Sequence, residues 1–280
     1  NIQLDYLSTS FQYFDISLDG LDGYRYSVEC HGSLYNGRSI GGGNRAFEYA
    51  AVTVVNGQYP NCMESARLDA NGRVVIVGQQ NQGGLSFVRK AFSPTDGGWI
   101  RFVDSYTNST SSAIDAVIQE NSQLSSNFYT GIVVDPASNG NTVMVTKETR
   151  DCCSIPAGFV MGGQGALAGT IAATGVKIPA GLSYDTYNSD YVKYQWNVSV
   201  PAGATVTFVH YAIGNSDQSA ITNTANALAT GTAAHQFDEM TATEKQQTMN
   251  FAIPQNSAAD VKGTIGTRSL VPALVPLIGL

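Results

Sequence analysis

The sequence carries little charge and has no region rich in basic residues. Only 13% of its 280 residues are charged, which is about half the usual share in soluble proteins. The 22 Asp and Glu outnumber the 15 Lys and Arg, so nucleic acid and anionic membranes are not expected as partners, because affinity for phosphate comes from clustered Lys and Arg. The polar but uncharged composition that remains is typical of secreted and cell-surface β proteins.

Long hydrophobic runs are also missing. The most apolar tail, Ser269 to Leu280, is short and interrupted by Pro272 and Pro276, so we expect no membrane span. We interpret residues 269–280 as an apolar docking segment that is buried either in its own domain or, by strand addition, in a neighbouring copy of an oligomer or polymer. The candidate assembly residues are Val271, Leu274, Val275, Leu277, Ile278 and Leu280.

The sequence lacks the usual signatures of catalysis and cofactor binding. It has no phosphate-binding Gly-Lys-Ser/Thr loop, no Gly-x-Ser-x-Gly elbow and no His-Glu-x-x-His helix. His31, His210 and His235 are too widely spaced to predict a metal triad. Most turn aspartates are expected to bond their own backbone. We therefore predict no catalytic, cofactor-binding or metal residue, while a structural calcium ion on one such turn stays open.

Cysteine is scarce, with four residues in the chain. An even count in an exported protein favours at least one disulfide, and we expect Cys30 to pair with Cys62. Cys152 and Cys153 are adjacent, so they could pair only through a strained ring, stay free, find partners elsewhere or bridge two subunits. These alternatives stay open.

Short alternating apolar and polar runs dominate what is present. From Tyr191 to Val200, apolar and aromatic residues occupy every second position, which predicts a strand with one buried face. The segment Pro201-Ala-Gly203 interrupts this run, and Thr205 to Ala212 is again β-branched and aromatic. We interpret the two runs as an antiparallel hairpin.

Further strands are predicted in a meander between Asp69 and Asn121. The runs Arg73 to Val77, Leu85 to Phe92 and Trp99 to Tyr106 are separated by Gly-containing turns. In some of them both faces are apolar, and a sheet of this kind must be covered twice. The predicted fold is all-β and mainly antiparallel, a single large β-sandwich domain over residues 1–280.

A short helical insertion is expected near the C-terminal end, at about residues 217–250. Apolar residues recur at three- and four-residue spacing from Asp217 to Ala229, and Gly231 follows as a stop signal. A second helix is predicted to start at Thr241, because Thr241 and Glu244 have the spacing of a capping box.

Two segments resemble regions of large secreted bacterial surface proteins. One runs from Val200 to Phe251 and contains Val-Thr-Phe-Val-His-Tyr-Ala-Ile. The other runs from Gly84 to Thr110 and contains Gly-Trp-Ile-Arg-Phe-Val-Asp-Ser-Tyr. Such regions are similar to the β-supersandwich of galactose-mutarotase-like domains. The resemblance implies a fold and no catalytic residue, because no mutarotase acid or base matches a position here.

These observations favour a non-enzymatic structural protein of an extracellular surface layer or filament, self-assembling through sheet edges and apolar termini. The chain begins at Asn1 without a leader, so we expect a processed or excised product located outside the cell. Asn108 and Asn197 match the glycosylation acceptor pattern. Carbohydrate binding is the alternative function. A polysaccharide-active enzyme is a third, which would require His210 or His235 to share a cleft with Tyr, Arg or carboxylates.

Overall fold

The computed structural model describes residues 15–20, 23–40, 43–61, 65–69, 72–125, 130–140, 142–148, 155–163 and 191–253. Antiparallel strands form most of this part of the chain, which confirms the predicted all-β class. The strands are β1 (Asp15–Asp19), β2 (Tyr24–Glu29), β3 (Leu34–Ser39), β4 (Arg45–Val55), β5 (Ser65–Leu68), β6 (Val74–Gln82), β7 (Leu85–Phe92), β8 (Trp99–Thr107), β9 (Ile114–Leu124), β10 (Thr130–Val134), β11 (Val143–Glu148), β12 (Ala157–Val160), β13 (Tyr191–Val200) and β14 (Thr205–Gly214).

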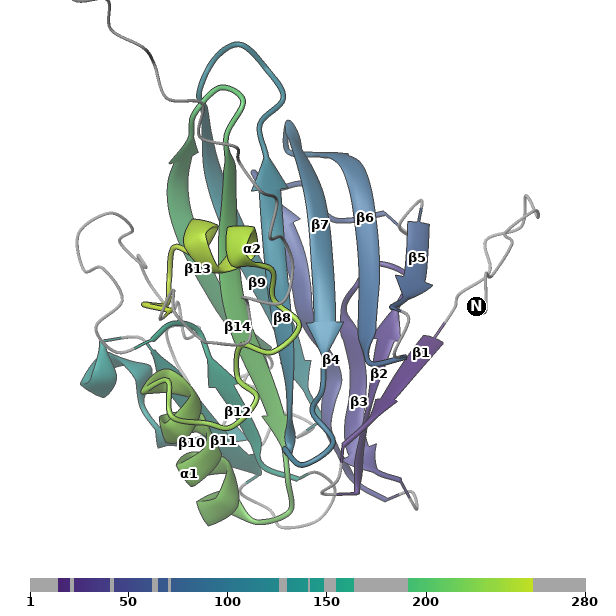
Figure 1. The fold of residues 1–280 in the computed structure, drawn as a ribbon. Helices are drawn as coiled ribbons and strands as arrows, with labels where there is room; N and C mark the ends of the chain where they lie inside the picture. The colour runs from purple at the N-terminus through teal and green to yellow at the C-terminus, as the bar shows by residue number, and fades with distance from the viewer. Residues whose placement is uncertain are drawn as a thin grey trace, which may run out of the picture.

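The strands form two stacked sheets (Figure 1). The six-stranded sheet has the order β1-β2-β3-β4-β9-β13, and the eight-stranded sheet has the order β10-β11-β12-β14-β8-β7-β6-β5. The predicted meander is confirmed for β6, β7 and β8, which are consecutive neighbours, whereas β9, which follows them in the predicted range, belongs to the six-stranded sheet. The turn after β4 has positive φ at both Asn56 (49°) and Gly57 (79°), the conformation that a type I′ turn requires.

The predicted hairpin of β13 and β14 is wrong, because these strands belong to different sheets. β13 pairs with β9, whereas β14 pairs with β8 and β12. The Pro-Ala-Gly segment between them therefore carries the chain from one sheet to the other. The burial patterns explain the difference: β13 alternates between buried and more exposed residues, while nearly every residue of β14 is buried. A strand covered on both faces belongs in the middle layer.

The eight-stranded sheet is this middle layer. Its inner face packs on the six-stranded sheet, and Trp196 of β13 stacks on Phe208 of β14 with ring centroids 4.7 Å apart. Its outer face is covered by the helical part, through contacts among residues such as Trp99, Val209 and Ile221. The strands that the sequence marks as apolar on both faces are thus covered twice, as predicted.

Two helices lie within the expected insertion, α1 (Gln218–Ala229) and α2 (Ala242–Gln247), and a single 3-10 turn, η1, spans Pro136–Asn139. Asp217 caps α1 by accepting hydrogen bonds from the backbone of Ser219 and Ala220. The capping box of Thr241 and Glu244 is present at the start of α2. Among the described residues, no helix is long and apolar enough to cross a membrane.

Gly158 of β12 lets α1 pack closely on the sheet. A Cβ at this position would lie 2.6 Å from Cγ2 of Ile221, far inside van der Waals contact. We expect Gly158→Ala to lower the free energy of unfolding by about 1–3 kcal/mol, because the added methyl must push α1 outward. Asn223→Ala, on the exposed side of the same helix, is the matched control and should leave stability nearly unchanged. Chemical denaturation measures both, and equal stability of the two variants would contradict this packing.

Candidate functional site

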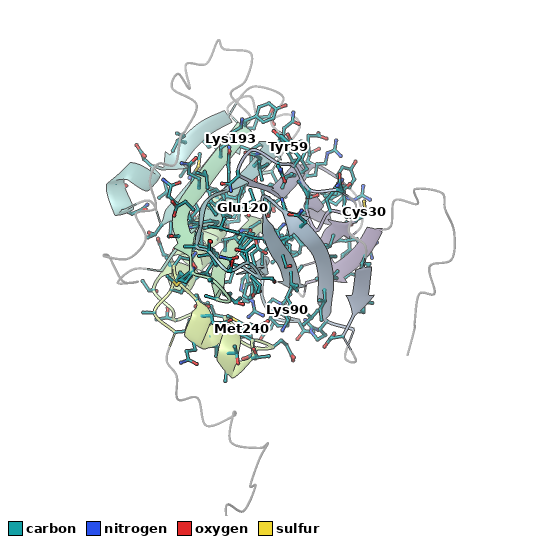
Figure 2. The ribbon with its side chains drawn as sticks, turned by 90° about the horizontal axis from the view of Figure 1, so that it is seen from above. Cys30, Tyr59, Lys90, Glu120, Lys193 and Met240 are labelled. Atoms are coloured by element: carbon teal, nitrogen blue, oxygen red, sulfur yellow. The ribbon has the colours of Figure 1, made fainter. Side chains whose placement is uncertain are left out.

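The interior between the two sheets contains a network of charged side chains. Arg89 of β7, Asp104 of β8 and Glu120 of β9 are all 0% exposed. They point inward because each occupies the same side of its strand as large apolar neighbours. Figure 2 shows Glu120 between the two layers of strands.

Arg89 is the centre of this network. Its Nε and Nη2 atoms donate to the two carboxylate oxygens of Asp104, at 2.7 and 2.6 Å. Nη2 also donates to Oγ1 of Thr53 at 2.6 Å and to Oε2 of Glu120 at 3.1 Å. Nη1 donates to the carbonyls of Gly32 and Ala51. One guanidinium therefore joins residues of both sheets and of the turn between β2 and β3.

His210 of β14 completes the network. Its Nε2 lies 3.0 Å from Oδ2 of Asp104, and its Nδ1 lies 2.9 Å from the hydroxyl of Tyr194. Because an ionised carboxylate only accepts, Nε2 donates a proton to Asp104. His210 is thus a packed, hydrogen-bonded core histidine.

Asp104, Glu120 and His210 are close enough together to suggest a metal site, with ligand atoms within 4.8 Å of one another. However, Nη2 of Arg89 lies within 3.4 Å of an atom of each of the three. The guanidinium thus already places a positive charge beside all three groups, and a metal ion added there would meet strong repulsion. We conclude that Arg89 is the cation of this cluster.

The two carboxyl groups respond to burial in opposite directions. Burial alone raises the pKa of Asp104, but the charge of Arg89 and its hydrogen bonds outweigh this effect and hold the pKa at about 2. Burial also raises the pKa of Glu120, and there the single, longer contact with Arg89 does not compensate. The geometry therefore favours the ionised form of Asp104 more than that of Glu120.

This asymmetry predicts opposite pH dependences for two variants. The pKa of Asp104 is lowered from 3.8 to about 2, so its ionised form stabilises the fold above pH 3.8 and this contribution is lost as the pH falls toward 2. We expect Asp104→Asn to cost ~3 kcal/mol at neutral pH and little near pH 2. The pKa of Glu120 is raised from 4.5, so its contribution is greatest below pH 4.5 and declines as the pH rises.

Glu120→Gln removes this ionisation, and its stability relative to the wild type should therefore increase as the pH rises above 4.5. Thermal unfolding of both variants across acid and neutral pH measures the two curves. Parallel curves would contradict the opposite pKa shifts of the two carboxyl groups.

The network has the residue types of a reaction centre but no access to solvent. Tyr194 is 3% exposed, and the charged members are sealed completely. A substrate could reach them only if the two sheets separated. The cleft that the enzymatic alternative requires at His210 is therefore not found in the described part of the chain.

The accessible candidate site is a hollow of about 300 Å³ on the outer face of the six-stranded sheet. Strands β4, β9 and β13 form its floor, and the turn after β2 and the segment after β4 form its rim. Three tyrosines and several polar groups line it: Tyr49, Tyr59, Tyr191, His31, Asn121 and Lys193. Figure 2 places Tyr59 and Lys193 on this side, with Lys90 and Met240 on the opposite side.

Strand alternation explains why these side chains face outward. Asn121 follows the inward Glu120 on β9, and Lys193 precedes the inward Tyr194 on β13. Successive strand residues point to opposite faces. Asn121 and Lys193 are also direct cross-strand partners. Tyr59 extends furthest into solvent, with 66% of its surface exposed.

His31, Ser33 and Glu29 lie together in this hollow but do not have the geometry of a nucleophilic triad. Ser33 Oγ lies 3.0 Å from His31 Nδ1 and donates to Glu29 Oε2 at 3.1 Å. The same His31 nitrogen lies 3.5 Å from that carboxylate oxygen. In a catalytic triad, the nucleophile and the carboxylate bond different ring nitrogens of the histidine. Ser33 is moreover 0% exposed, so this group positions the rim of the hollow.

The three histidines lie in three different parts of the structure. His31 lies in the hollow, and His210 lies in the interior. His235 is exposed, with Nδ1 2.7 Å from Asp238 and Nε2 3.1 Å from Asp96. The hydrogen bond that the ring donates to Asp238 and the charge of Asp96 raise the pKa of His235.

The remaining predicted residues are only partly placed. Cys30 follows β2 and is buried, while Cys62, Cys152 and Cys153 lie outside the described residues, so the pairing of Cys30 with Cys62 stays a prediction. The assembly segment 269–280, with Val271, Leu274, Val275, Leu277, Ile278 and Leu280, also lies outside the described residues.

The two glycosylation candidates have different surroundings. Asn108 is 0% exposed, and its Nδ2 donates to the carbonyls of Ser112 and Val200. Asn197 is exposed on the outer face of β13. In the folded chain, Asn197 is therefore the candidate that an acceptor reaction could reach.

Comparison with known proteins adds no family. No family model matches the chain, and no curated protein matches it. Solved structures that share part of its shape include a TPR-domain-containing protein from Parabacteroides distasonis, at 12% identity and a TM-score of 0.46, covering 73% of this chain and 47% of that one. A mutant of heparan sulfate lyase HepC from Pedobacter heparinus has 11% identity and a TM-score of 0.45, covering 76% of this chain and 37% of that one.

The chain spans less than half the length of both of these proteins. At these scores neither of them assigns a fold family or a function to this chain. The resemblance to galactose-mutarotase-like domains therefore stays a prediction, and the β-rich architecture itself is what the structure establishes.

Proposed function

We propose that this protein binds carbohydrate in the hollow between Tyr59 and Lys193, without cleaving it. The observation that carries the proposal is the combination of Tyr59, which is 66% exposed, with outward polar groups of β9 and β13 around one concave surface. An exposed aromatic ring packs against the C–H face of a sugar, and amide and ammonium groups bond its hydroxyls. Carbohydrate binding was the alternative that the sequence left open.

We propose that the protein does not cleave its ligand because the hollow and the buried network around Arg89 are separate. The groups with large pKa shifts around Arg89 are sealed in the interior, whereas His31, Ser33 and Glu29 in the hollow lack a relay geometry. Active sites usually combine shifted pKa values with access to substrate, and these two properties are separate here.

An extracellular location is part of the same proposal. The surface is polar with few charges, and Asn197 presents an acceptor site on an exposed strand. A sugar-binding hollow is useful where free glycans or cell-wall polymers are met.

Self-assembly is a second candidate, favoured by the position of β13. This ten-residue strand is the last of the six-stranded sheet and pairs on one side with β9 among the described residues. A long edge strand is a template for pairing with another chain. Electron microscopy of the purified full chain tests this candidate: fibres or rings support it, and monodisperse monomers at high concentration contradict it.

Carbohydrate binding predicts a clear result for two variants. Tyr59→Ala and Lys193→Ala should each weaken binding of a ligand found on a glycan array by about tenfold, or ~1.4 kcal/mol. The matched controls are Val88→Ala and Lys147→Ala, which remove an exposed apolar and an exposed basic side chain from strands of the other sheet. They should bind as the wild type does. Calorimetry with the array ligand measures all four variants.

The array ligand should also survive prolonged incubation with the protein. Release of new reducing ends that is lost in His31→Ala or Tyr59→Phe would contradict a purely binding role. Failure of the wild type to bind any glycan on the array would overturn the proposal as a whole.

A further inference from the structure

A second hollow lies on the same face of the same two strands. It is lined by residues of β9 and β13 only, among them Asp115, Val117, Asn197 and Ser199. The register of these strands places the two hollows in line, because the outward pairs run from Asn121 and Lys193 at one end to Asp115 and Ser199 at the other. Six residues of strand separate these ends, which is about 20 Å.

The surface between the two hollows is polar and carries no charge. The outward cross-strand pair between them is Gln119 with Gln195, and the next outward pair, Val117 with Asn197, already belongs to the second hollow. The amides are ordered in rows, since Gln119 Nε2 donates to Asn121 Oδ1 at 2.8 Å and Gln195 Nε2 donates to Asn197 Oδ1 at 3.5 Å. Amide side chains offer a ligand both hydrogen-bond donors and acceptors.

An exposed apolar group stands at each end of this surface. Tyr59 borders the first hollow, and Val117, which is 40% exposed, lies in the second. A ligand that alternates apolar C–H faces with hydroxyl groups would match this surface, because the surface has apolar groups at its two ends and amides between them. A protein partner that covered this face would bring apolar side chains against the amides and leave them unpaired.

The charges argue against a polyanion. Lys193 is the one basic residue of β9 and β13, and each hollow contains an acidic residue, Glu29 in the first and Asp115 in the second. A polymer with a negative group on every unit would meet these carboxylates, and the chain has a net charge of −7.

We propose that the outer face of β9 and β13 is a track for a linear, predominantly uncharged polysaccharide, which occupies both hollows at once. This inference rests on the proposed carbohydrate binding at Tyr59 and adds the length and charge class of the ligand. A short oligosaccharide fills the first hollow alone, and a longer one gains contacts along the amide rows and in the second hollow.

Chain length and charge test this track. The probes are dimers and hexamers of β-1,4-glucan, β-1,3-glucan and β-1,4-mannan, together with the hexamer of galacturonate as the charged counterpart. At least one neutral hexamer should bind about tenfold or more tightly than its dimer, and the galacturonate hexamer should bind more weakly than that neutral hexamer.

The remote end of the track is tested by the double variant Val117→Ala/Asn197→Ala. We expect it to weaken hexamer binding by about threefold to tenfold and to leave dimer binding unchanged. Val88→Ala/Asn223→Ala removes the same two side-chain types from exposed positions elsewhere and should change neither. Thermal unfolding of both double variants checks that the fold is intact.

The outcomes separate the two proposals. Equal affinity for dimer and hexamer, or an unchanged hexamer affinity in Val117→Ala/Asn197→Ala, overturns the track while binding that depends on Tyr59 still supports the hollow. Tighter binding of the galacturonate hexamer than of every neutral hexamer overturns the proposal that the ligand is uncharged. If the wild type binds no glycan, both the hollow and the track are overturned. If the protein forms a dimer that dissociates when Val117 and Asn197 are replaced, the face is a protein interface and the polysaccharide track is overturned.

Discussion

The positive charge of Arg89, buried between two carboxyl groups, is the interaction on which the rest of this structure depends. A charge removed from water is tolerated only when it is paired and its hydrogen-bond donors are satisfied. Arg89 meets this requirement with Asp104, Glu120, Thr53 and backbone carbonyls of the facing sheet. Such a network adds little net stability compared with an apolar core. A shift of one sheet against the other would, however, leave a buried charge unpaired, which costs several kcal/mol. We therefore regard it as the element that sets the two sheets in register.

The same alignment positions the outer face. Glu120 and Asn121 are neighbours on β9, and Tyr194 and Lys193 are neighbours on β13, with one of each pair inside and one outside. A one-residue shift of register that turned Glu120 and Tyr194 outward would turn Asn121 and Lys193 away from the outer face. The interior network and the proposed sugar track thus depend on one register between the two strands.

Much of the fold could be predicted from the sequence because strand periodicity is a local property. The bounds of β13, the turn at Asn56 and the capping box at Thr241 all follow from neighbouring residues. The pairing of β13 could not be predicted in this way. A short Pro-Gly loop suits both a hairpin and a change of sheet, and only the full burial of β14 decides between them.

The candidate sites were harder to predict, since they are assembled from distant strands. The interior network did leave a signal that the sequence analysis missed: Arg89 lies in register with the apolar Phe87 and Ala91, and Asp104 lies between Phe102 and Tyr106. A charge on the apolar side of a strand implies a buried partner. The hollow left no comparable signal, because Tyr59 follows a turn and meets β9 and β13 only in the folded chain.

The position of Asn197 has a practical consequence for anyone preparing this protein. It is exposed, belongs to an Asn-Val-Ser acceptor sequence and lies on the floor of the second hollow. A eukaryotic expression host that attached an oligosaccharide there would cover the face with a covalently bound sugar of its own. Material from yeast or insect cells and material from a bacterium could then differ in ligand affinity although they share one amino-acid sequence, and enzymatic deglycosylation would reveal the difference.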